Sequence, residues 1–156
     1  MTPETDAPVT LFGRIESAMR DAMRARDERR TQTLRMAMAA AHNLKIARGR
    51  DLNDDEVVDV LTKQLKQRRE SVAIYRDAGR GDRADAEEAE AAILTEFLPQ
   101  QLSEDEVTSM ARAAISEAGA SSPADMGRIM GMLSPQTKGR ADGRMVSDVV
   151  RRLLAG

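Results

Sequence analysis

The chain has 156 residues, 41% of them apolar, and its 24 lysines and arginines nearly balance 26 acidic residues, leaving a net charge of -2. It has no cysteine and a single histidine, His42, which excludes a disulfide framework, a cysteine nucleophile and thiolate or two-histidine metal motifs. A serine triad would have to use His42. Aromatic residues make up only 2%, so the core must be built from aliphatic residues and methionines, and the residue chemistry alone identifies no reaction.

The N-terminal residues do not read as a secretory signal, because Met1 to Asp6 contains no basic segment followed by an apolar run. No window approaches the ~18 consecutive apolar residues of a membrane-spanning helix. We therefore expect a cytoplasmic protein that does not associate with membranes, and we expect residues 1–8 to be disordered.

Apolar residues recur at helical spacing along almost the whole chain, and sustained alternation typical of strands is absent. Before Pro99 the stripes run over residues 11–23, 34–44, 58–75 and 86–97, and the third advances by alternating steps of three and four, like a heptad seam. After Pro99 come three shorter stripes, over 107–115, 126–133 and 145–153. The pattern predicts an all-α fold in which a four-helix bundle (1–98) precedes a smaller three-helix subdomain (99–156).

Helix starts are clearly marked. Asn53 to Glu56 and Ser103 to Glu106 are typical of capping boxes, and Ser122 precedes a proline at the first helical position. We interpret the acidic residues at these starts as caps rather than metal ligands. Breaks are predicted at 26–30, 49–53, 79–83, 98–103, 119–123 and 133–142.

Three features have both a structural and a functional interpretation. His42 is interpreted as a partly buried, hydrogen-bonded side chain rather than a general base, since no nucleophile is near in sequence. Arg68, inside the heptad seam, either packs its stem in the core with its head reaching water or a carboxylate, or is a cation facing a groove. Met126, Met130 and Met132 are either core filler or a flexible partner-binding surface.

Charge is segregated in blocks. Residues 14–50 hold ten basic and four acidic side chains, and residues 128–156 hold six basic and two acidic ones. The segment from Lys138 to Arg144 combines three cations and two glycines at the start of the last helix, where a phosphate could bind. The competing interpretation, which the residues alone favour, is a structural turn with Gly139 at positive φ and Asp142 as the cap.

An ordered set of motifs resembles the YqeY family, the stand-alone relatives of the tail domain of GatB. The matching stretches are Thr33 to Met36 with Ala40 to Asn43, Lys66 to Ser71 with Tyr75 and Gly79-Arg80, Phe97 to Ser103, Asp125 to Met130, Leu133 to Pro135, and Lys138 to Gly143 leading into Val146. Phe97 departs from the tyrosine expected before Leu-Pro, which puts a hydroxyl contact in doubt.

The resemblance implies an all-helical protein with four helices followed by three. GatB belongs to the glutamine-dependent amidotransferase that corrects misacylated tRNA, and its tail helps to hold the tRNA. By resemblance we expect a non-catalytic module that binds tRNA, with the amidotransferase or other translation proteins as further partners. The expected RNA contacts are Lys138, Arg140 and Arg144, with Arg128, Arg151 and Arg152 in support.

Two other functions stay open at this stage. One is a protein-interaction module with no nucleic-acid role. The other is a carbon–nitrogen ligase with glutamine as amide donor, but the GatB domain that activates the carboxylate with ATP and magnesium has no match in this sequence. We expect no catalytic residue, no cofactor and no bound metal.

Overall fold

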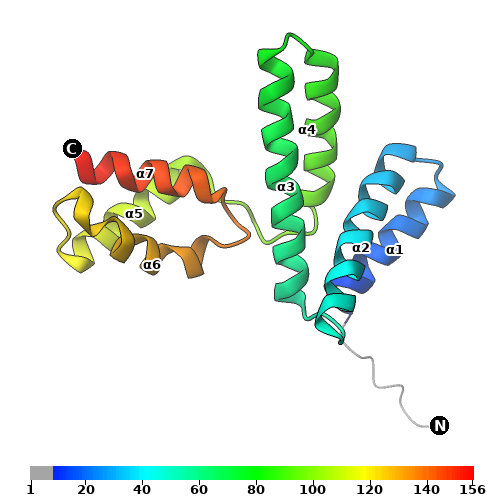
Figure 1. Cartoon of the computed structure of the whole chain (residues 1–156), viewed down its shortest axis with the longest axis horizontal. Helices are drawn as coiled ribbons and strands as arrows, with labels where there is room; N and C mark the ends of the chain where they lie inside the picture. The colour runs from blue at the N-terminus through cyan, green and yellow to red at the C-terminus, as the bar shows by residue number, and fades with distance from the viewer. Residues whose placement is uncertain (1–8) are drawn as a thin grey trace. The chain divides into compact units, whose positions relative to one another are not determined.

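The structure is a computed structural model that describes residues 9–156, so the disorder predicted for residues 1–8 falls outside the described residues. The described residues form seven α-helices and one 3-10 turn, with no strand, which confirms the all-α prediction (Figure 1). The helices are α1 (Leu11–Arg24), α2 (Glu28–Arg48), α3 (Asp54–Asp77), α4 (Gly81–Thr95), α5 (Glu104–Ala118), α6 (Met126–Thr137) and α7 (Gly143–Ala155), with the turn η1 (Pro123–Asp125) before α6. The chain divides into two compact units, an N-terminal unit that ends at Phe97 and a C-terminal unit that begins at Leu98.

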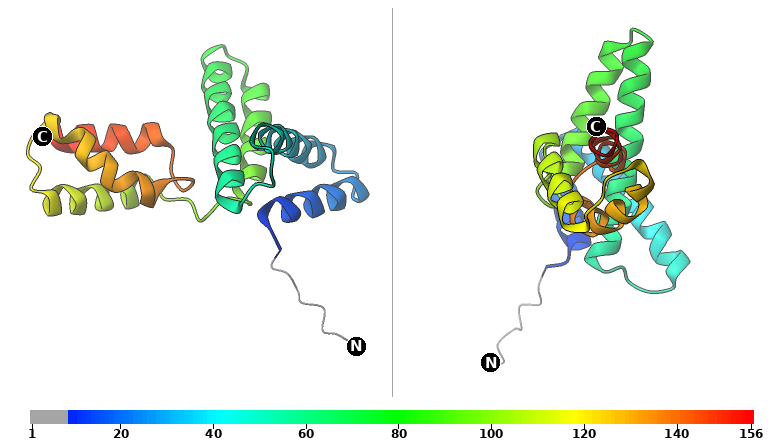
Figure 2. Two further views of the ribbon diagram at one scale, coloured as in Figure 1. Left: turned by 60° about the horizontal axis from the view of Figure 1, so that its bottom comes forward. Right: turned by 90° about the vertical axis from the view of Figure 1, so that its left-hand side faces the viewer.

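The N-terminal unit consists of two helical hairpins. Helix α1 packs against α2, α3 packs against α4, and α2 also contacts both α3 and α4 (Figures 1 and 2). Its core contains Ile15, Leu34, Leu61 and Leu94, each almost completely buried. The stripes in the sequence therefore identified the faces along which the hairpins associate.

The C-terminal unit packs α5, α6 and α7 around one apolar cluster. Its centre is formed by Val107, Ile129, Leu133 and Val150. Met126, Met130 and Met132 are partly buried against this cluster, as the core-filler interpretation predicted. The three helices thus pack nearly all of their large apolar side chains against one another.

Both predicted capping boxes are present. The Asn53 side chain accepts a hydrogen bond from the Glu56 backbone (2.9 Å), and the Glu56 carboxylate accepts one from the Asn53 backbone (3.2 Å). Ser103 and Glu106 repeat the reciprocal pair at the start of α5. These side chains satisfy backbone donors that have no partner inside the helix.

Several predicted breaks are too long. Helix α2 already begins at Glu28, and α4 already begins at Gly81. Pro123 opens the 3-10 turn instead of α6, which begins three residues later. Helix α6 also continues through Pro135 to Thr137. The proline removes one backbone hydrogen bond, but Leu133 and Thr137 are buried and the Thr137 hydroxyl donates to the Leu133 carbonyl (3.1 Å), so core packing outweighs the proline.

The predictions for His42 and Arg68 have different outcomes. The prediction that His42 is partly buried is wrong: its side chain is exposed, because residues next to each other in a helix point about 100° apart and the buried neighbour is Ala41. Arg68 is buried, with 8% of the residue exposed, and its head pairs with Glu87 (3.4 Å) and, in closer contact, Glu90 on α4. The packed-stem interpretation of Arg68 is confirmed.

Candidate nucleic-acid interface

The segment from Lys138 to Arg144 is a tight turn between α6 and α7. Gly139 has a φ of 72°, a conformation that costs glycine little. Asp142 accepts a hydrogen bond from the Arg144 backbone (3.1 Å), and α7 begins at Gly143. The interpretation of this segment as a structural turn, with Gly139 at positive φ and Asp142 as the cap, is therefore confirmed. The same turn places Arg144 in the first turn of α7.

A second segment of the same unit holds this turn in place. The Gln101 side chain donates to the Gly139 carbonyl (2.8 Å), and the Leu102 backbone donates to the Arg140 carbonyl (2.7 Å). These contacts join residues about forty positions apart in sequence, which is why motif spacing did not reveal them.

Arg140 contributes to holding the turn. Its Nε donates to the Gln100 carbonyl (3.2 Å) and its Nη1 to the Gln136 carbonyl (3.3 Å). An arginine side chain has five N–H donors, so three remain for other partners. Arg140 therefore positions the loop as well as offering a cation.

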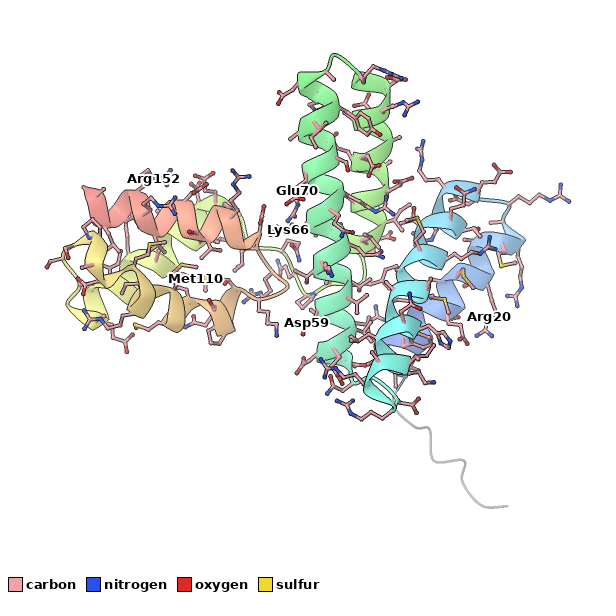
Figure 3. All side chains as sticks on the ribbon, viewed as in Figure 1. Arg20, Asp59, Lys66, Glu70, Met110 and Arg152 are labelled. Carbon is pink, nitrogen blue, oxygen red and sulfur yellow. The ribbon has the colours of Figure 1, made fainter. Side chains whose placement is uncertain are left out.

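Arg144 is exposed, and its guanidinium makes no hydrogen bond or ion pair with any described residue. Lys138 is also exposed. On α7, Arg151 and Arg152 follow Arg144 at spacings of seven and eight, which places the three on one helix face; Arg152 is labelled in Figure 3. The structure thus brings three of the predicted RNA contacts together on α7.

Acidic side chains neutralise part of this surface. Arg151 pairs with Asp148 (3.0 Å) and Arg152 with Glu104 of α5 (3.4 Å). Arg128, which lies on α6, pairs with Asp125 (3.1 Å). All three arginine side chains are more than half exposed, so the pairs are weak and can exchange partners at little cost.

Asp125 supports the turn that starts α6. Hydrogen bonds from the Ser121 and Ser122 backbones, and then the charge of Arg128, hold the pKa of Asp125 below its usual value. The two bonds are 3.0 and 3.3 Å long. Asp125 is therefore ionised at neutral pH and fixes the entry into α6.

A shallow hollow of about 370 Å³ lies beside the start of α7. Arg144 and Arg152 line it together with Glu104, Asp142 and Asp148. Among residues 9–156, these three acids included, no group of three histidine, cysteine, aspartate or glutamate side chains is placed to hold a metal ion. None of the described helices is long and apolar enough to cross a membrane.

Comparison with known families identifies the family of this chain. The family model of Yqey-like proteins matches residues 12–154, which include both units and the whole Lys138 to Arg144 turn. The chain belongs to the YqeY family. The resemblance noted in the sequence is thereby confirmed.

Two curated relatives of this chain are fungal proteins, each named Altered inheritance of mitochondria protein 41, mitochondrial. The one from Lachancea thermotolerans is 30% identical over 87 residues, which is 55% of this chain and 46% of the relative. The one from Pyrenophora tritici-repentis is 24% identical over 156 residues, which is 98% of this chain and 83% of the relative. The first match therefore spans less than half of that relative's length.

Proposed function

We propose that this YqeY-family protein is a non-catalytic helical module that binds tRNA and assists the glutamine-dependent amidation of misacylated tRNA. The observation that carries the proposal is Arg144, an exposed cation with no partner among the described residues, at the first turn of α7. It follows directly on the loop that resembles the GatB tail. Arginine and lysine bind nucleic acid chiefly by neutralising phosphates, and they need no aromatic platform to do so.

The six candidate cations take different parts in this proposal. Arg144 contacts phosphates directly, and the exposed Lys138 of the same turn adds a second cation. Arg151 and Arg152 join by leaving their exposed carboxylate partners, at small cost. Arg140 holds the loop in shape, and Arg128, paired on α6, contributes least.

The proposed compartment is one in which translation occurs. Both curated relatives carry the word mitochondrial in their names, so the interior of the mitochondrion stands beside the cytoplasm as the location. Either compartment contains tRNA and an aqueous environment suited to this charged surface.

Fluorescence anisotropy with tRNA, an unrelated RNA of the same length and a DNA duplex tests the proposal. Titrations between about 50 and about 200 mM salt separate phosphate contacts from other interactions. We expect a preference for tRNA that persists at the higher salt. Equal weak binding to all three nucleic acids, lost at the higher salt, would contradict the proposal.

A matched pair of variants locates the contact. Arg144→Ala should weaken tRNA binding and lower the salt slope by about one unit. Arg112→Ala is the control, since Arg112 is an exposed cation on α5 with no partner among the described residues. If both variants weaken binding equally, the assignment of the site to the start of α7 is wrong.

The amidation role has its own readout. Adding the protein to a tRNA-dependent amidotransferase supplied with misacylated tRNA should increase product formation most where tRNA is limiting. An Arg144→Ala variant should give a smaller increase than the Arg112→Ala control. No effect of the wild-type protein would restrict the proposal to tRNA binding.

A further inference from the structure

The short connection between α1 and α2 (Figure 1) contains an arginine in the left-handed backbone conformation. The Arg26 backbone donates to the Met23 carbonyl (3.2 Å) and the Asp27 backbone donates to the Ala22 carbonyl (3.0 Å), which are the two hydrogen bonds of a Schellman motif. Arg26 has a φ of 57°, in the region that a Cβ atom disfavours. Glycine is the usual residue at this position of the motif.

Other helix ends in the chain avoid this strain. Helices α2 and α5 end in the same left-handed conformation at Gly49 and Gly119. Among residues 9–156, Arg26 is the only residue other than glycine with a positive φ. Side chains held on a strained backbone cluster at functional sites. An arginine at a position suited to glycine therefore indicates that its side chain has a use.

The arginines around this turn are free to bind an anion. Arg26, Arg29 and Arg35 are exposed, and none of their guanidinium groups makes a hydrogen bond or ion pair with a described residue. Residues 24–35 hold five arginines but only two acidic residues. One of these acids, Asp27, is already used as the cap of α2. The end of the α1–α2 hairpin is therefore positively charged.

A hollow of about 430 Å³ opens beside the turn. Arg26 from the connection and Arg35 from α2 both line it, so two guanidinium groups from different elements share one space. They outnumber the single carboxylate of the lining, and the forked guanidinium matches the oxygen geometry of a phosphate group. The other residues of the lining are Met23, Glu28, Thr31 and Gln32.

This lining favours nucleic acid over a protein or a membrane surface. Met23 is the one apolar side chain among the described residues that line the hollow. The core of a protein–protein interface is apolar and depleted of charge, and a helix that lies on a membrane needs a wide apolar face. Interfaces with nucleic acid are more polar and much more positively charged. The hollow therefore fits a sugar–phosphate backbone best.

We propose that Arg26, together with Arg29 and Arg35, binds the phosphate backbone of RNA at the α1–α2 turn, and that the strained backbone of Arg26 serves to place its guanidinium beside that of Arg35. This site goes beyond the proposed function, since it lies in the N-terminal unit and uses none of the cations of α7. Phosphate contacts carry no sequence information, so the site adds affinity for RNA of any sequence.

Replacing Arg26 by glycine in the full-length protein separates binding from folding. Arg26→Gly relieves the left-handed backbone and should raise Tm by about 2–4 °C. The same variant should weaken the binding of tRNA and of an unrelated RNA of the same length by the same factor, about fivefold to tenfold, and should lower the salt slope by about one unit. Thermal unfolding and fluorescence anisotropy measure the two effects. A purely structural arginine would not give a more stable protein that binds more weakly.

Further variants test the charge and the place of the contact. Arg26→Lys keeps both the charge and the Cβ atom, so it should leave Tm and the salt slope unchanged. Adding Arg35→Ala to Arg26→Gly should lower the salt slope by about two units in total. Arg14→Ala is the matched control, because Arg14 is an exposed arginine of α1 whose side chain also has no partner among the described residues, and it should leave RNA binding unchanged.

Combining Arg26→Gly with Arg144→Ala distinguishes this site from the one on α7. We expect each variant to weaken RNA binding both alone and in the presence of the other. If Arg144→Ala weakens binding and Arg26→Gly does not, the present proposal is wrong and the proposed function stands. If only Arg26→Gly weakens binding, the site on α7 is wrong and the present proposal stands.

Three other results would overturn the proposal. One is an Arg14→Ala variant that weakens RNA binding as much as Arg26→Gly does. Another is an unchanged Tm of Arg26→Gly, which would show that the left-handed backbone costs nothing here and would remove the reason for assigning Arg26 a function. The third is a polyglutamate peptide or a phosphatidylglycerol vesicle that binds more tightly than RNA and loses this binding in Arg26→Gly, since the partner would then be an acidic protein or a membrane.

Discussion

The two units of this YqeY-family protein use charged residues in opposite ways. In the N-terminal unit Arg68 and Glu56 are buried, and each is paired with two oppositely charged side chains. In the C-terminal unit the buried cluster is apolar, and the arginines pair only at the exposed surface. Arginine therefore specifies how helices associate in one unit and remains available to a ligand in the other.

Removing the buried cation should have the largest effect. Arg68→Ala leaves Glu87 and Glu90 without a buried partner, which typically costs about 3–5 kcal/mol of stability. Urea unfolding followed by circular dichroism measures the loss. Arg69→Ala is the matched control, because Arg69 is the exposed next residue on α3 and should change stability by less than about 0.5 kcal/mol. Equal effects of both variants would mean that Arg68 does not stabilise the junction of α3 and α4.

The next largest effect on stability should distinguish Arg140 from Arg144, which lie in the same turn. Arg140→Ala removes two hydrogen bonds to carbonyls and should destabilise the C-terminal unit by about 1–2 kcal/mol. Arg144→Ala removes no side-chain hydrogen bond or ion pair with a described residue. It should therefore leave the stability unchanged while it weakens the binding of tRNA. Thermal unfolding and anisotropy on the same two variants test this division. A destabilised Arg144→Ala variant would show that its charge also supports the fold.

The paired carboxylate of the N-terminal unit predicts a pH dependence. Hydrogen bonds from Arg50 and the Asn53 backbone, with the charges of Arg50 and Arg48, hold the pKa of Glu56 below its usual 4.5. A carboxylate with a lowered pKa in the folded state contributes stability that is present above pH 4.5 and is lost as the pH falls through the lowered value. Urea unfolding midpoints across that range should fall less steeply for Glu56→Gln than for the wild type. Parallel curves would exclude a contribution from Glu56.

The parts of this structure that could be predicted from sequence depend on local signals. The capping boxes at Asn53 and Ser103, the positive φ of Gly139 and the burial of Arg68 all follow from residues a few positions apart. The contacts of Gln101 and Arg140 join distant segments, so no local pattern reveals them.

The smallest predicted effect tests whether the surface pairs of the C-terminal unit are truly exchangeable. Glu104→Gln should change stability by less than about 0.5 kcal/mol, because its pair with Arg152 is exposed. The same variant releases Arg152 and should strengthen tRNA binding by about twofold. Glu117→Gln, another exposed acid on α5 that has no partner among the described residues, removes the same charge without releasing an arginine. If Glu117→Gln strengthens binding as much, the gain comes from the change in net charge, and the release of Arg152 from Glu104 contributes nothing to the interface.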